Sequence, residues 1–142
     1  MSLSAGIVSS ETLETFNVIK LLDKNILTDD SELVWDVLSK HSGRQNETSI
    51  IDIVLDNAGY EFFTDLLLAV YIIHNQYANK VRFYVKKFPW FISDVTKKDF
   101  NWVIHQLIKS DANNMKKFGL MCEEFLKTGA IIIQVNCFLS NN

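Results

Sequence analysis

"IDIVLDNAGYEFF" (residues 51–63) decides the fold of this chain: an apolar run ends at Asp56 and Asn57, and a second apolar run begins after Gly59. The near-continuous apolarity of residues 50–55 predicts a strand that is buried on both faces, as in a parallel sheet. The polar pair after that strand has two interpretations. Asp, Asn and Gly are common turn residues, but a carboxylate beside an amide also offers oxygen ligands to a metal ion.

The sequence on either side of this stretch predicts alternating helices and strands. Helices are expected where apolar residues recur at helical spacing, where they run almost continuously, or where capping signals occur: residues 11–22, 30–40, 60–77, 96–109 and 113–128. Thr96 and Asp99 are spaced like a capping box at the start of the fourth helix, and Gly129 follows the fifth. Residues 80–85 alternate like a second strand, and the tail after Gly129 fits a third.

The order strand, helix, strand predicts two parallel strands that end at the same edge of a sheet. Asp56 and Asn57 directly follow the first strand, and Asp94 lies after a loop that is long enough to fold back to the same edge. Neighbouring strands are about 4.8 Å apart, so two carboxylates and an amide oxygen can meet in the crevice where open sheets bind ligands. Such ligands suit Mg²⁺ or Mn²⁺, and the metal and turn interpretations both stay open.

Other polar and aromatic residues are weaker candidates. Glu61 belongs to the first turn of the third predicted helix, where the helix dipole favours a carboxylate, yet it also faces the crevice; Asp65 is better explained as an ordinary helical residue. The histidines share no ligand spacing: His41, His74 and His105. A cluster of aromatic residues is expected in the core rather than on a substrate platform: Phe88, Trp90, Phe91, Phe100 and Trp102.

The bulk properties of the chain narrow the class of protein. The 142 residues suit one domain, and a net charge of −3 without a long basic run argues against nucleic acid as a partner. Cys122 and Cys137 lie in no metal or redox spacing, which indicates free thiols in a reducing compartment. We see neither a signal peptide nor a run of about 18 apolar residues that could span a membrane. The expected location is the cytoplasm, with the nucleus as a second candidate.

Two longer stretches carry a resemblance to a known family. "DIVLDNAGYEFFTDLLLA" (residues 52–69) and "KVRFYVKKFPWFISDVTKKDFNWVI" (residues 80–104) resemble the metal-dependent damage-control phosphatases. Within that family they are most similar to the branch called acidic residue methyltransferase 1, or sugar phosphate phosphatase. The resemblance runs from about Leu27 to Gly129, and its specific part is a strand followed by Asp-Asn, with a later Pro-Trp-Phe-x-Ser-Asp.

The resemblance implies a three-layer α/β/α Rossmann-like fold and a phosphatase that uses a divalent cation, namely Mn²⁺, Ni²⁺, Co²⁺ or Mg²⁺. The substrates it implies are sugar phosphates such as fructose 1-phosphate and fructose 6-phosphate, with a second activity that methylates protein glutamates from S-adenosylmethionine. Its metal ligands fall on Asp56, Asn57 and Asp94, with Asp56 also catalytic, and its S-adenosylmethionine site falls on Glu61 and Asp94. No residue of this chain matches the lysine and loop that hold the substrate phosphate in the family.

These expectations divide the chain into three parts. Residues 1–48 are expected to form a helical N-terminal segment, residues 49–129 the metal-binding βαβ part, and residues 130–142 a divergent tail. The first functional hypothesis is a fragment of a metal-dependent phosphatase. The alternative is a catalytically inactive remnant that binds a protein partner. Both leave apolar surface uncovered, so self-association is also expected.

Overall fold

The structure is a computed structural model that describes residues 17, 21, 25–41 and 49–136. The chain divides into two compact units, residues 1–36 and 37–142. The helix predicted over residues 11–22 therefore lies almost entirely outside the described residues. The next predicted helix is confirmed as α2, Ser31–His41, which begins where the Asp29 carboxylate accepts a hydrogen bond from the Ser31 N–H at 2.9 Å.

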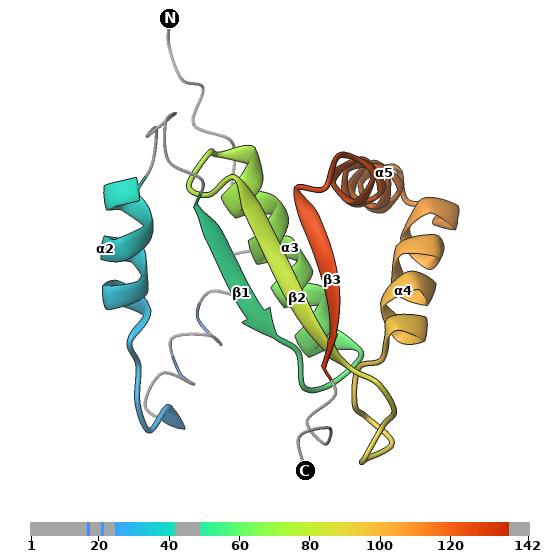
Figure 1. Ribbon diagram of the computed structural model, residues 1–142, viewed down its shortest axis with the longest axis horizontal. Helices are drawn as coiled ribbons and strands as arrows, with labels where there is room; N and C mark the ends of the chain where they lie inside the picture. The colour runs from blue at the N-terminus through green and yellow to red at the C-terminus, as the bar shows by residue number, and fades with distance from the viewer. Residues whose placement is uncertain (1–16, 18–20, 22–24, 42–48, 137–142) are drawn as a thin grey trace, which may run out of the picture. The chain divides into compact units, whose positions relative to one another are not determined.

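Three strands form a parallel sheet in the order β1-β2-β3 (Figure 1): β1 is Ile50–Val54, β2 is Lys80–Lys86 and β3 is Ile131–Asn136. Ile50 lies opposite Lys80 in the register of the first pair, and Val81 lies opposite Ile131 in the second. The predicted strand–helix–strand unit is confirmed, as is the third strand. The parallel sheet with its helices is a mixed α/β fold, consistent with an incomplete Rossmann-like architecture.

Three helices connect the strands: α3 is Tyr60–His74, α4 is Lys97–Lys109 and α5 is Asn113–Thr128. The predicted capping box is present, because the Thr96 hydroxyl accepts from the Asp99 N–H while the Asp99 carboxylate accepts from the Thr96 N–H. Gly129 ends α5 in the left-handed conformation, as predicted. None of the helices in the described part of the chain is both long and apolar enough to cross a membrane.

The core lies on one face of the sheet. Phe83 of β2 packs against Phe62 of α3 and Phe100 of α4, with ring centroids 6.4 and 5.3 Å away, and all three side chains are fully buried. Phe63 of α3 contacts Phe118 of α5 with centroids 5.8 Å apart. Because α3 and α4 pack against the face of β2 that carries Phe83, and α5 packs against α3 through Phe118, all three helices lie on the same side of the sheet.

The opposite face corrects one prediction. β1 was expected to be buried on both faces, but Ile50 is 46% exposed and Val54 is 70% exposed. The reason is that β1 is an edge strand and that α3, α4 and α5 all pack against the other face of the sheet. The continuous apolar run therefore predicts the strand correctly, but it does not predict whether helices cover one face of the strand or both.

The aromatic cluster gives a second correction. Phe100 is fully buried as predicted, whereas four of the five residues are exposed: Phe88, Trp90, Phe91 and Trp102. Residues 88–91 lie in the loop between β2 and α4, outside the sheet, and Trp102 lies on the outer side of α4. The loop that carries three of these rings borders the carboxyl end of the sheet, where the candidate site lies.

Candidate functional site

The predicted meeting of Asp56, Asn57 and Asp94 at one edge of the sheet is confirmed. The chain leaves β1 through the buried Leu55, and the loop after β2 folds back so that Asn57 and Asp94 face each other in an antiparallel bridge. Two backbone hydrogen bonds hold this bridge: the Val95 N–H donates to the Asp56 carbonyl at 3.0 Å, and the Ala58 N–H donates to the Ser93 carbonyl at 2.6 Å. The role of these residues as metal ligands stays a prediction.

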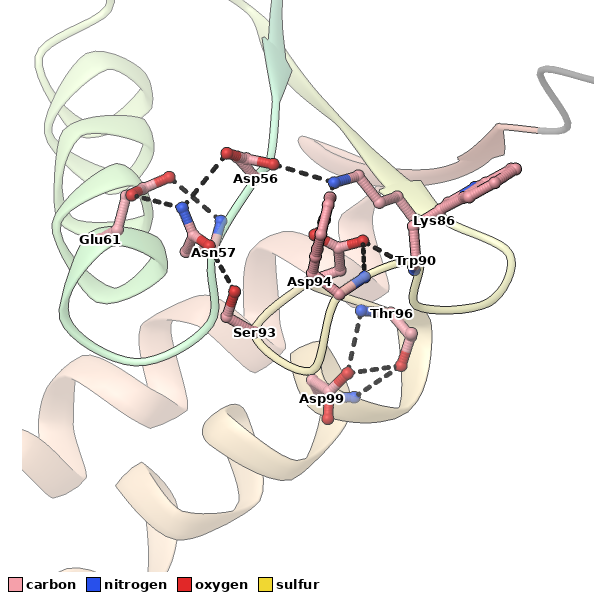
Figure 2. A network of polar contacts seen from close by, with 10 residues as sticks. Asp56, Asn57, Glu61, Lys86, Trp90, Ser93, Asp94, Thr96 and Asp99 are labelled. Carbon is pink, nitrogen blue, oxygen red and sulfur yellow. Dashed lines mark hydrogen bonds and ion pairs between the residues drawn. The ribbon is translucent and has the colours of Figure 1, made fainter.

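Asp94 is the buried anchor of the site, with only 3% of the residue exposed. Its Oδ1 accepts a hydrogen bond from Lys86 Nζ at 2.7 Å, and its Oδ2 accepts from the backbone N–H groups of Trp90 at 2.8 Å and Phe91 at 3.0 Å (Figure 2). The Lys86 ammonium and these N–H groups hold the pKa of Asp94 below its usual value. The carboxylate is therefore ionised at neutral pH although it is buried.

Lys86 joins the two acidic residues of the crevice. Its Nζ lies 2.8 Å from Asp56 Oδ1 as well as 2.7 Å from Asp94 Oδ1, and these two carboxylates raise the pKa of the lysine (Figure 2). Our sequence reasoning missed this residue. The register of the sheet identifies it: β1 and β2 pair residues that are 30 positions apart, which places a lysine opposite Asp56, and this offset is known only from the structure.

Asn57 connects Asp56 to Glu61. Its side-chain amide donates to Asp56 Oδ2 at 3.2 Å and to Glu61 Oε2 at 3.1 Å, and its backbone N–H donates to Glu61 Oε1 at 3.1 Å. Ser93 donates to Asn57 Oδ1 at 2.7 Å from the facing loop. Gly59 makes the turn into α3 at a φ of 85°, a conformation that other residues adopt only with strain, and so brings Glu61 back to the pair.

The remaining polar candidates do not join this network. Asp65 lies one turn further along α3, where burial first and the nearby Glu61 second raise its pKa. His74 and His105 are exposed and make none of these contacts. The side chain of His41 lies outside the described residues.

The charges of the site favour a cation. Three carboxylates, those of Asp56, Glu61 and Asp94, face one ammonium, that of Lys86, which leaves two negative charges in excess at neutral pH. In the described part of the chain, no three His, Cys, Asp or Glu side chains are grouped closely enough to hold a metal by themselves. A metal here would therefore need the amide oxygen of Asn57 as a ligand.

The amide of Asn57 can supply that oxygen by a rotation. As placed, it presents its NH₂ group to Asp56 and its oxygen to Ser93. A half-turn exchanges the two atoms within the same volume, and the Ser93 hydroxyl can then accept instead of donate. The donor set of two carboxylates and an amide oxygen therefore fits a hard divalent cation.

Comparison with known proteins places this geometry in context. A sequence model of the damage-control phosphatase ARMT1-like domain matches residues 1–141, which extends beyond the region that carries the resemblance. The chain is 39% identical to damage-control phosphatase ARMT1 of Homo sapiens over 140 residues, which are 97% of this chain and 32% of the relative. It is also 39% identical to damage-control phosphatase ARMT1 of Danio rerio over 132 residues, 91% of this chain and 30% of the relative. The chain thus spans about a third of the length of these relatives.

Proposed function

Because the chain belongs to the damage-control phosphatase ARMT1-like domain family, we propose that it forms the metal-binding part of a divalent-metal-dependent phosphatase that acts on sugar phosphates. One observation carries the proposal: the carboxylates of Asp56 and Asp94, from different strand ends, share a single cation, the ammonium of Lys86. A crevice that stabilises one positive charge between two carboxylates offers the electrostatic environment that a divalent cation needs.

The two carboxylates differ in exposure, which suggests different roles. The side chain of Asp94 is 2% exposed and is held by backbone N–H groups, so it suits a fixed ligand. The side chain of Asp56 is 66% exposed and can reach a substrate, either as a shared ligand or as a nucleophile toward phosphorus. The bound cation, Mn²⁺, Ni²⁺, Co²⁺ or Mg²⁺, would polarise a phosphoryl oxygen and neutralise charge that develops during transfer.

The sugar phosphates that we propose as substrates are fructose 1-phosphate and fructose 6-phosphate, in line with the resemblance. The phosphate-holding lysine and loop that the resemblance implies match no residue here, and the chain spans only about a third of its relatives. Positioning of the phosphate carries much of the catalysis in phosphoryl transfer. We therefore expect the 142-residue chain alone to turn over well below about 1 s⁻¹.

Titration calorimetry with Mn²⁺ tests the metal site. We expect weak binding that is lost in Asp56→Ala and in Asp94→Ala. Asp52→Ala is the matched control, because Asp52 is an exposed carboxylate of β1 that pairs with Arg82 outside the crevice. Unchanged affinity in both site variants would overturn the proposal.

An assay with fructose 1-phosphate and p-nitrophenyl phosphate tests catalysis. Turnover near 1 s⁻¹ or above, within the ordinary range of enzymes, that disappears in Asp56→Ala would show that this part of the domain suffices without the missing phosphate-holding groups. Methyl transfer from S-adenosylmethionine bound at Glu61 and Asp94 stays a prediction from the resemblance.

A second candidate function is a protein-interaction module. It is favoured by the sheet face that carries the exposed Ile50 and Val54, because an apolar edge strand can pair with another chain. Sedimentation at high protein concentration tests it, with self-association as the expected result. A monodisperse monomer at every concentration would contradict self-association.

A further inference from the structure

We propose that Lys86 is an internal counter-ion of the crevice: its ammonium holds Asp56 and Asp94 together in the metal-free protein and leaves them when a divalent cation binds. The inference rests on the metal site of the proposed function and goes further, because it assigns a role to a residue that neither the strand-end argument nor the resemblance identified. It also predicts an unusual direction of change, namely that removing the charged side chain of Lys86 from the site tightens metal binding.

The individual oxygen atoms carry the inference. Asp94 Oδ2 is already occupied by the N–H groups of Trp90 and Phe91, so Oδ1 is the oxygen that remains for a cation. Lys86 Nζ occupies that oxygen at 2.7 Å, a distance typical of a strong charge-assisted hydrogen bond. A divalent cation that binds Asp94 and leaves both backbone hydrogen bonds intact therefore binds at Oδ1, where it competes with the ammonium.

The same competition holds at Asp56. Its Oδ2 accepts from the Asn57 amide at 3.2 Å, and its Oδ1 accepts from Lys86 Nζ at 2.8 Å. The oxygens that point into the space between the two acidic residues are thus the two that hold the ammonium (Figure 2). Lys86 and a metal shared by Asp56 and Asp94 cannot occupy that space together.

Lys86 is able to leave. Its backbone is fixed, because its N–H donates to the Val95 carbonyl at 3.0 Å, but its side chain is 30% exposed. A lysine side chain has a flexible four-carbon stem and an ammonium with freely rotating donors, so the charge can move to solvent while the strand stays in place. An arginine fork would be held more rigidly by two carboxylates.

Removing Lys86 should change metal affinity in opposite directions, depending on whether the residue is an internal counter-ion or only a structural residue. As an internal counter-ion, Lys86 stabilises the metal-free fold but weakens the apparent affinity for metal, since it must first be displaced. If Lys86 only positioned Asp94, it would support the metal-free fold and metal binding alike, and its loss would weaken the two together. Metal affinity, rather than activity, is therefore the informative measurement.

The first experiment is a calorimetric titration of MnCl₂ into the full chain, using wild type, Lys86→Met and Lys87→Met. Lys87 is the matched control, because it is the next residue, exposed, and makes no ion pair within the described residues. We expect Lys86→Met to bind Mn²⁺ about 10-fold more tightly than wild type, which corresponds to about 1.4 kcal/mol. Lys87→Met should stay within about 2-fold, because a distant exposed charge is screened by solvent and salt.

Each other outcome is decisive. Equal or weaker binding in Lys86→Met, while Asp56→Ala abolishes binding in the wild-type background, overturns the inference and leaves the metal site standing. No binding in wild type but binding in Lys86→Met supports it. No binding in either protein overturns the inference together with the metal site.

A second experiment needs no destabilising substitution. The ¹⁵N signal of the Lys86 ammonium, assigned by its loss in Lys86→Arg, is followed by NMR while MgCl₂ is added to wild type. We expect this signal to shift or broaden in step with the Asn57 amide, while the exposed Lys127, paired with Glu123 at 2.8 Å, is unaffected. A Lys86 signal that stays fixed while the Asn57 amide shifts overturns the inference alone. If neither signal responds, the metal site fails as well.

Discussion

Two carboxylate–cation pairs join β1 and the residues just after it to β2, and their difference shows which of them is built for a ligand. Asp52 pairs with Arg82, and Asp56 pairs with Lys86, each across 30 positions of the chain. In the first pair, Nε and Nη2 of the guanidinium each lie 2.7 Å from a different carboxylate oxygen. In the second, one ammonium is divided between Asp56 and Asp94.

The first pair is complete and the second is not. A planar guanidinium matches both oxygens of one carboxylate, so the Asp52–Arg82 pair leaves no oxygen without a donor and no charge without a partner. The Lys86 ammonium faces two carboxylates, with Glu61 close by through Asn57, so negative charge remains in excess. Two pairs of similar chemistry on the same two strands thus differ in whether they can accept a further cation.

The largest expected contrast comes from removing one acidic residue of each pair. Asp94→Asn should lower the melting temperature of the metal-free protein by roughly 10 °C, because a buried ion pair is broken and an amide NH₂ replaces an accepting oxygen. Asp52→Asn should change it by no more than about 2 °C, since exposed pairs contribute little. Thermal unfolding followed by circular dichroism measures both. Equal shifts in the two variants would show that the second pair is not special.

Metal addition should separate the pairs next. Mn²⁺ at 100 times its dissociation constant should stabilise the folded protein by about 2.7 kcal/mol. Asp52→Asn should keep this gain, while Asp56→Asn should lose it, because only Asp56 belongs to the crevice. The measurement is the melting temperature with and without Mn²⁺. A gain that persists in Asp56→Asn would place the cation elsewhere.

Alkaline pH should affect only the lysine pair, by a few degrees in melting temperature. The carboxylates raise the pKa of Lys86 above 10.5 in the folded protein, so its contribution is fully present below about pH 10.5 and is lost as the pH rises through the folded value. Asp52 raises the pKa of Arg82, which for a guanidinium is already higher than that of lysine, so the arginine keeps its charge over this range. Lys86→Arg should therefore lose less stability than wild type above pH 10.5. Parallel pH profiles for the two proteins would contradict this.

Acid should weaken both pairs over the same pH range, although by different amounts, which provides the control for that experiment. Arg82 lowers the pKa of Asp52, and Lys86 with two backbone N–H groups lowers the pKa of Asp94. A carboxylate whose pKa is lowered by folding stabilises the protein above its unfolded value of about 3.8, and this contribution is lost as the pH falls below it. Wild type and Lys86→Arg should consequently lose stability over the same acid range.

The smallest effect is expected when the first pair is made to resemble the second. Arg82→Lys replaces the fork by a point charge and should lower the melting temperature by no more than about 2 °C, with unchanged affinity for Mn²⁺. Calorimetry and thermal unfolding of this variant measure both quantities. A gain or loss of metal affinity would mean that the two pairs are coupled along the strands.

The sequence predicted the parts of the site that follow from chain order. Parallel strands must end at one edge, so Asp56, Asn57 and Asp94 could be brought together without coordinates. Lys86 could not be recognised in the same way, because its position depends on the register between β1 and β2 and on how the loop after β2 closes. Chain order is enough to predict which residues reach the same edge of a sheet. Predicting which of them are in contact also requires the register between the strands.

Burial was predicted less well than the elements themselves. Ile50 and Val54 of the apolar run and the aromatic residues Phe88, Trp90 and Phe91 were expected inside, and they are exposed. Hydrophobicity reports the free energy of removing a side chain from water, but not whether a neighbouring layer is there to cover it. The expected third layer is not formed by α3, α4 or α5, so the error follows from which face those helices cover.

The hydrogen bond from the Trp90 N–H to Asp94 Oδ2 has an optical consequence. It links a carboxylate in the crevice to a residue that is 68% exposed and whose ring lies 5.8 Å from that of Phe88. A change in what Asp94 binds alters the backbone that carries this indole, and so alters the surroundings on which its fluorescence depends. With Trp35 and Trp102 replaced by Phe, the chain would carry a single tryptophan, whose fluorescence reports the occupancy of the crevice beside it.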